Sequence, residues 1–343
     1  MKRAPFRLAG LACMLVCALL FGGCMNPNIR EDEIRSDLPA LDPQAGVAKS
    51  IDVTCYYQLL REPYLYGTAR ALEVHANERA EHAIVNALLE GAQAFGGLNG
   101  LFPAGTSIVD ITMDGGILYV TLSGEFMDES ALRRALNELE NAMEQGRYTQ
   151  AEYEALVGAA EQSALDVRRL ALYSLVNTLT GYDDDMRVLL LVDADGSGVG
   201  ERVAQAALGM STSDGTLVEP MSFVQGVTKT ETDTVDLALA HMQAGDYASA
   251  YALFADTSGD NTSTPHYAVF ESELRALGAL QSYAINSYMR DADGELLYAS
   301  ADLIFIDAQG NENAQRGRHL PVRKQGLLYK LDYAAFIGAM GGK

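Results

Sequence analysis

The sequence predicts an α+β fold with two domains, and three observations lead to that prediction. The chain beyond residue 50 is roughly 290 residues long, which exceeds one typical domain core. Alternating apolar runs that favour strands occur beside apolar residues at helical spacing. A polar, threonine-rich stretch at residues 224–234 separates two such sets. Because each set can bury a core of its own, we expect domains at residues 51–226 and 230–343 that fold independently.

The N-terminus has the pattern of a secretory signal peptide over residues 1–23. A basic region at residues 1–7 precedes an apolar run, residues 8–21, that is too short for a stable membrane span. We expect the polar, proline-containing residues 24–50 to form a flexible tether.

Cys24 directly follows two glycines, and this pattern resembles the lipobox of bacterial lipoproteins. The resemblance implies transfer of a diacylglyceryl group to the Cys24 sulfur, cleavage before Cys24, and anchoring by acyl chains such as palmitate. Phe21 departs from the pattern, because leucine is usual there. The implied location is the cell membrane, on its extracytoplasmic face. The alternatives to a lipid anchor are ordinary secretion and a retained single-span anchor.

The cysteines and the net charge limit the disulfides and the binding partners that this protein can have. Of the four cysteines, Cys13 and Cys17 lie in the signal, so only Cys55 remains as a free thiol once Cys24 is acylated. No intramolecular disulfide is then possible. Removal of the signal takes the formal net charge from −21 to −24, because three basic residues leave with it. Such a surface repels nucleic acid and anionic headgroups, so neither is an expected partner.

The first domain opens with two predicted strands at residues 51–60 and 65–74. Asn77 is expected to cap a helix over residues 78–91, whose apolar positions fall on one face. A hairpin follows at residues 107–113 and 117–122, because the intervening Asp114-Gly115-Gly116 tolerates the positive φ angles of a tight turn. Residues 187–193 are almost uniformly apolar and predict a buried strand.

The pattern around this hairpin resembles the GerMN domain of sporulation and spore-germination proteins and of many bacterial lipoproteins. The matching features are Pro103-x-Gly105-Thr106 before the first strand, Tyr119-Val120-x-Leu122-Ser123 in the second, and the acidic–aromatic pair Glu125-Phe126. Residues 175–180 also match the family's second helix. The resemblance implies a GerMN-type sheet with packed helices and an envelope role in sporulation or germination. It favours assembly or binding over catalysis.

A strongly helical segment at residues 127–164 interrupts this pattern as an insert. Leu132, Leu136, Leu139 and Met143 form an amphipathic stripe, and Gly146 breaks it. The capping box at residues 149–152 starts a second helix that can run unbroken into residues 170–180. The insert has two interpretations, namely packing on the domain's own sheet or a partner-binding helix pair.

The second domain shows two helices around Gly245-Asp246-Tyr247, at residues 233–244 and 247–254, and a third at 267–277. Strands are expected at residues 280–290, 296–307, 318–324 and 326–333. The helix, Gly-Asp-Tyr, helix opening resembles the small α+β domains of the NTF2-like superfamily. That superfamily's enzymes use a buried acid or histidine, for which Asp302 is the candidate, although strand alternation can equally direct it outward.

The sequence points to no reaction. It contains no zinc-protease motif, nucleophile elbow, acylation pair or phosphate-binding loop, and its five histidines are scattered. Glu125 and Asp128 are the imaginable carboxylate pair, although solvation of such a pair is commoner. Asp193 and Asp195 invite a calcium interpretation, but Ala204 stands where the loop needs a bidentate glutamate. We therefore expect no catalytic residue, no cofactor and no metal.

The function expected is that of a lipid-anchored envelope protein that binds another envelope protein or peptidoglycan. The alternative is an enzyme that acts on peptidoglycan.

Lipidation generates the first testable prediction. Replacing the acceptor thiol by Cys24→Ala should abolish incorporation of a clickable fatty acid into the protein during metabolic labelling. Equal labelling of the variant and the wild type would rule out the lipid anchor at Cys24.

Overall fold

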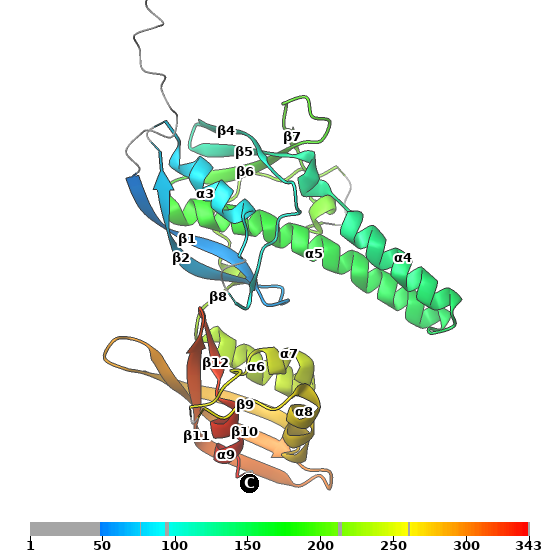
Figure 1. Cartoon of the computed structure of the whole chain (residues 1–343), viewed down its shortest axis with the longest axis vertical. Helices are drawn as coiled ribbons and strands as arrows, with labels where there is room; N and C mark the ends of the chain where they lie inside the picture. The colour runs from blue at the N-terminus through cyan, green and yellow to red at the C-terminus, as the bar shows by residue number, and fades with distance from the viewer. Residues whose placement is uncertain (1–48, 76, 93–95, 212–214, 260, 342–343) are drawn as a thin grey trace, which may run out of the picture. The chain divides into compact units, whose positions relative to one another are not determined.

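The computed structural model describes residues 49–341 except for residues 76, 93–95, 212–214 and 260. These residues form a mixed α+β structure with three four-stranded sheets and seven α-helices in the described part of the chain (Figure 1). The expected signal peptide, Cys24 and residues 24–48 of the expected tether lie outside the described residues, whereas Lys49 and Ser50, which were expected to end the tether, begin the first strand. No helix in these ranges combines the length and the apolar character that crossing a membrane requires.

The first sheet has the order β3-β1-β2-β8. Strands β1 (Lys49–Leu59) and β2 (Leu65–Val74) pair as a long antiparallel hairpin, and β3 (Leu98–Asn99) extends one edge. Strand β8 (Thr228–Lys229) pairs in parallel with β2, so the chain returns to this sheet just after the expected domain end at residue 226. Side chains of β1 alternate between buried and exposed, as one covered sheet face requires.

Helix α3 (Ala80–Leu89) packs on this hairpin and is shorter than expected. Arg79, rather than Asn77, occupies the N-cap position, and no side-chain hydrogen bond caps the helix. The start of the helix is therefore fixed by burial of Ile84, Val85 and Leu88, and the expectation of an asparagine cap was wrong.

The second sheet has the order β4-β5-β6-β7 and contains the predicted hairpin. Strands β4 (Ile108–Asp114) and β5 (Ile117–Ser123) are joined by Gly115 and Gly116, with φ of +56° and +77°. Both positive values confirm the predicted turn chemistry. Strand β6 (Arg187–Asp193) runs parallel to β5, and the short β7 (Glu201–Arg202) closes the sheet.

Helix α5 (Gln150–Tyr182) is the longest element, with 33 residues, and confirms the predicted unbroken helix. Its second half is buried from Leu170 to Thr180 and packs on β1 and β6. Polar side chains of this half form hydrogen bonds with backbone groups that have no partner in a neighbouring strand. Ser174 Oγ donates to Tyr56 O over 2.5 Å, and Thr178 Oγ1 accepts from Tyr56 N over 3.1 Å. The Asn177 side chain likewise bonds both backbone groups of Val224, at 2.7 and 3.0 Å.

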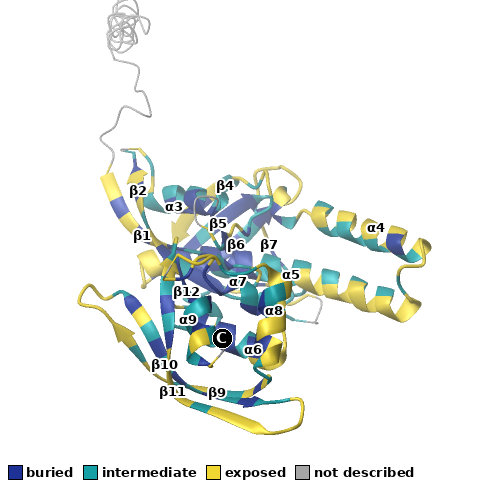
Figure 2. Ribbon diagram, turned by 60° about the horizontal axis from the view of Figure 1, so that its bottom comes forward, coloured by how far each residue is buried: buried dark blue, intermediate teal, exposed yellow. Residues whose placement is uncertain are grey.

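The first half of α5 and helix α4 (Ser130–Glu144) form a helical arm, which projects as an antiparallel pair (Figures 1 and 2). Gly146 ends the turn between the helices with φ of +71°. The predicted capping box is present, since Thr149 and Glu152 exchange side-chain and backbone hydrogen bonds. Most arm residues are exposed or half-buried, in contrast to the core half of α5.

The C-terminal half carries the third sheet, in the order β12-β11-β10-β9. The strands are β9 (Ala279–Arg290), β10 (Leu296–Ile306), β11 (Glu312–Gln325) and β12 (Leu328–Leu331). The helices of this half are α6 (Asp233–Ala244), α7 (Tyr247–Ala252), α8 (Tyr267–Ala276) and α9 (Tyr333–Ala339).

This half differs from expectation at its end. The last strand stops at Leu331, because Asp332 accepts from Ala335 N over 3.0 Å and caps the unpredicted helix α9. Phe254 packs edge-on against Phe270 and Phe336, so aromatic rings fill the space between the helices. Strand β11 also begins six residues earlier than the expected start at residue 318.

The two halves of α5 generate the second prediction. Leu175→Ala, at a fully buried position, should lower the free energy of unfolding by about 3 kcal/mol, because it removes buried methyl groups and leaves a cavity. Leu156→Ala, in the arm at 37% exposure, should cost less than about 1 kcal/mol. Urea unfolding followed by circular dichroism measures both values. Equal losses would contradict the division of α5 into core and arm.

Candidate functional site

An apolar groove with a cavity volume of ≈ 640 Å³ lies at the base of the helical arm. One wall is the loop at residues 101–104, a second is the start of α4, and the third is the middle of α5. The large apolar side chains of its lining include those of Phe102, Phe126, Leu132 and Val167. A volume of this size falls in the range that holds a small ligand or the side chains of a docked segment.

The loop wall takes its shape from the Pro-x-Gly-Thr motif. Thr106 donates from its backbone N–H and its hydroxyl to Pro103 O, over 3.2 and 2.8 Å. Gly105 adopts φ of +90°, which disfavours any residue with a side chain. The turn sets Phe102 beside Phe126, with ring centroids 6.2 Å apart. The motif that carries the family resemblance therefore builds one wall of the groove.

The helical walls of the groove carry small side chains. Ala131 and Ala135 of α4, and Ala160 and Ala164 of α5, line it at four-residue spacing, so each pair lies on one helix face. Alanine leaves room for another backbone to approach closely. Sequence analysis did not identify this site, although the alanine spacing was a visible signal. What the sequence did not show was that the loop at residues 101–104 lies beside these helices.

Glu125 lies in the 3₁₀ helix Gly124–Met127, and Asp128 follows it, directly before the N-cap of α4. Asp128 accepts hydrogen bonds from the Ser130 backbone N–H, at 3.0 Å, and from its hydroxyl, and these bonds lower its pKa. A hydrogen bond from Ser123 is the main cause that lowers the pKa of Glu125. A general acid at neutral pH needs a raised pKa, so these carboxylates have the opposite tuning.

Arg168 ties the arm to the body at the groove. Its side chain is 11% exposed and donates to Ala207 O over 3.0 Å and to Met127 O over 3.4 Å. It also lies 3.6 Å from the Glu129 carboxylate. These contacts join α5 to the segment that enters α4, so they fix the angle at which the arm leaves the body.

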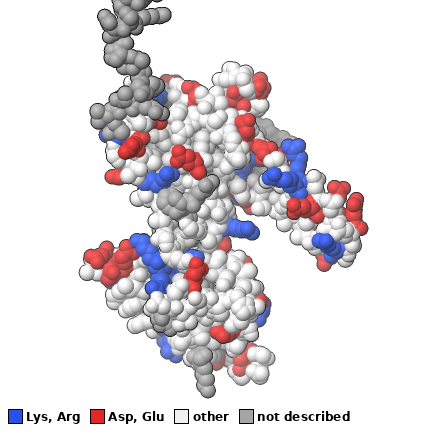
Figure 3. All heavy atoms as spheres, in the orientation of Figure 1, with Lys and Arg blue, Asp and Glu red and all other residues white. Residues whose placement is uncertain are grey.

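The apolar stripe of the insert is half-buried and lies between the two helices of the arm. Helix α4 packs on α5, and the four stripe residues keep intermediate exposure. The interpretation that the insert packs on its own sheet is therefore not what the structure shows. The continuity of α5 carries the arm away from the sheet. Acidic and basic side chains are interspersed on the face of the arm that Figure 3 shows.

The acidic loop after β6 is a turn with internal bonds. Asp193 is 5% exposed and accepts the backbone N–H groups of Ser197 and Gly198, at 3.0 and 2.9 Å. Asp195 accepts from Ser197 N over 3.0 Å. Within the described ranges, three ligand-type side chains lie close enough to share an ion only at Asp183, Asp184 and Asp185, which are all exposed.

Two other sequence candidates are structural. Asp302 accepts the Gly317 N–H over 2.6 Å and lies on the sheet face opposite the buried Ala301 and Leu303, so it does not point into an interior pocket. Cys55 is fully buried, and burial raises the pKa of its thiol. No histidine joins the ligand-type cluster found in the described residues.

Comparison with known proteins gives one match. A family model described as Germane, sporulation and spore germination, matches residues 61–195. These residues include the groove and the helical arm, and the match links them to sporulation and spore germination. The Germane family is not an enzyme family. No curated protein and no solved structure matches the chain.

Proposed function

We propose that this protein is a lipid-anchored envelope protein that binds a protein partner through the helical arm and its groove, during sporulation or spore germination. It is held on the extracytoplasmic face of the cell membrane by Cys24. The observation that carries the proposal is the apolar groove at residues matched by the Germane model. The GerMN-type first domain and the NTF2-like second domain belong to the same proposal.

The chemistry of the groove favours a protein partner over peptidoglycan. Glycan strands and stem peptides are polar, whereas the larger part of the groove lining is aromatic, aliphatic and alanine side chains. Charged side chains of Asp128, Glu129, Arg134 and Arg168 complete the lining. Grooves of this type accept the apolar face of a helix, since its side chains fill the hollow and its backbone approaches the small residues. Of the apolar stripe on α4, Leu132 belongs to the groove lining and would contact such a helix.

The alternative function is an enzyme that acts on peptidoglycan. Glu125 and Asp128 are the carboxylate pair that the sequence offers for such a reaction, and the pKa of both is lowered. Protonation of a leaving group at neutral pH would require one of them to be raised. The observations therefore support binding.

A pair of charge insertions on α5 tests the proposed function. Ala164→Arg places a charge in the groove, whereas Ala159→Arg places the same charge on an exposed arm position outside it. In a host that lacks the gene, the Ala164 variant should fail to restore spore yield or germination, because a desolvated charge opposes docking. The Ala159 variant should restore it. Immunoblots establish that both proteins accumulate equally.

Equal complementation by the two variants would contradict a role for the groove. Incubation of the full-length protein with purified cell wall tests the alternative. Release of muropeptides would support the enzyme and contradict the proposal.

A further inference from the structure

A second cleft lies in the C-terminal half, between α6 and the outermost strand of the third sheet. Its volume is ≈ 690 Å³, and Asp233, Asp236 and Gln243 of α6 face Tyr283 and Tyr288 of β9 across it. Strand β9 ends the sheet order and, in the described part of the chain, pairs only with β10. A strand at such an edge presents backbone N–H and C=O groups that a further strand can pair with.

One hydrogen bond shows that a backbone carbonyl at this edge of β9 accepts a donor from α6. Gln243 Nε2 donates to Gln281 O over 2.7 Å. Gln281 falls at a register shift and has no partner residue in β10. A side-chain amide therefore occupies a β9 carbonyl as the backbone of an added strand would. Residues 282–285 follow this point in regular register, which leaves a short continuous stretch of edge.

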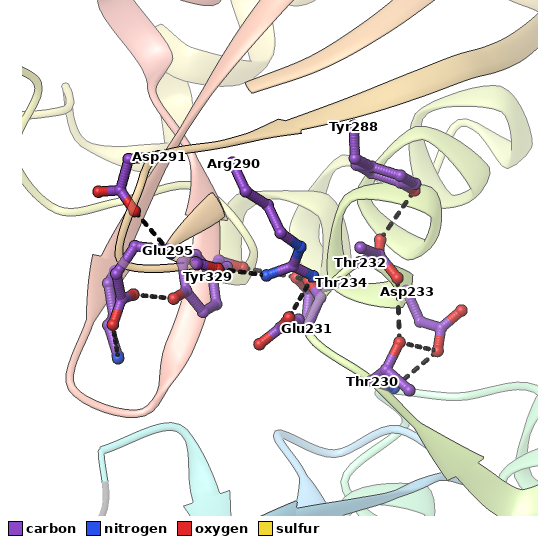
Figure 4. Close-up of polar contacts among 12 residues, drawn as sticks. Thr230, Glu231, Thr232, Asp233, Thr234, Tyr288, Arg290, Asp291, Glu295 and Tyr329 are labelled. Atoms are coloured by element: carbon purple, nitrogen blue, oxygen red, sulfur yellow. Dashed lines mark hydrogen bonds and ion pairs between the residues drawn. The ribbon is translucent and has the colours of Figure 1, made fainter. Parts of the chain in front are cut away.

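The α6 side of the cleft is acidic, and no described lysine or arginine lines it. One oxygen of Asp236 accepts the Tyr283 hydroxyl over 3.0 Å, and one oxygen of Asp233 accepts from Thr230 N over 2.6 Å. Neither carboxylate forms an ion pair with any described residue. Arg290, farther along β9, is already paired with Glu231 (Figure 4).

The tyrosines report the same environment. Burial raises the pKa of Tyr283 to about 12, with a further contribution from its hydrogen bond to Asp236. Burial also raises the pKa of Tyr288 to about 12, and the charges of Asp236 and Asp233 add to the shift. Tyr288 donates its hydroxyl to Thr232 O over 3.1 Å, so it keeps its proton in the cleft (Figure 4).

We propose that the cleft binds an extended peptide segment with basic side chains, which pairs with the free edge of β9. The peptide backbone forms hydrogen bonds with the alternate residues among 282–285 whose N–H and C=O groups face the free edge, and a lysine or arginine side chain approaches Asp233 and Asp236 from the cleft side. A stretch of four residues forms few backbone bonds, so the charge contacts are needed for measurable affinity. This interaction is independent of the groove at the helical arm.

Binding of a defined peptide tests the proposal. The probe is a fluorescein-labelled, capped peptide of three Thr-Lys repeats, and its fluorescence polarisation is measured with the full-length protein. Saturable binding is expected, and the corresponding Thr-Glu peptide should not bind. Asp233→Asn combined with Asp236→Asn keeps one acceptor oxygen on each side chain and removes both charges, so it should weaken binding about tenfold. Asp183→Asn combined with Asp184→Asn makes the same charge change elsewhere and should leave binding unchanged.

Backbone methylation separates strand pairing from charge attraction. Methylation of alternate peptide nitrogens removes the donors from one edge of the peptide strand, so one of the two alternate isomers should lose binding and the other should keep it. Equal behaviour of the two isomers would overturn the proposal. So would equal weakening by the two double variants, or the absence of saturable binding to the wild type.

Discussion

The structure of the first half depends on one helix that serves two environments. The C-terminal half of α5 is buried, and there Ser174, Thr178 and Asn177 bond backbone groups of Tyr56 and Val224 that have no sheet partner. Each of these bonds to a part-buried backbone group contributes about 0.5–1.5 kcal/mol. The same helix continues without a break into the arm. The position of the arm therefore follows from the hydrogen bonds and packing that fix the buried half of α5.

This constraint explains why the groove has a defined shape. A pair of helices that contact each other alone has little buried surface to hold it in one orientation. Here α5 is anchored in the core, Arg168 joins it to the segment before α4, and the Thr106–Pro103 turn fixes the facing loop. A partner that binds the groove thus contacts three elements whose relative positions are set by the body of the domain.

The sequence predicted the elements of this fold better than their contacts. The Gly115-Gly116 turn, the Thr149–Glu152 capping box and the continuous α5 depend on local chemistry, which neighbouring residues specify. Helix α9 was missed because Tyr333 and its neighbours suit a strand or a helix, and the cap at Asp332 decided between them. The groove could not be predicted, since it requires Phe102 and Ala164, distant in sequence, to line one hollow.

A distance measurement along α5 tests most directly whether the arm is a rigid extension of a core helix, as the continuity of α5 implies. Spin labels on ketone-bearing residues that replace Ala151 and Tyr182, both exposed, leave the native cysteines untouched. Pulsed electron–electron double resonance should give one narrow distribution of spin–spin distances near 47 Å, because roughly 31 residues at about 1.5 Å each separate the two positions. A broad or much shorter distribution would show a hinge between core and arm and would contradict a rigid α5.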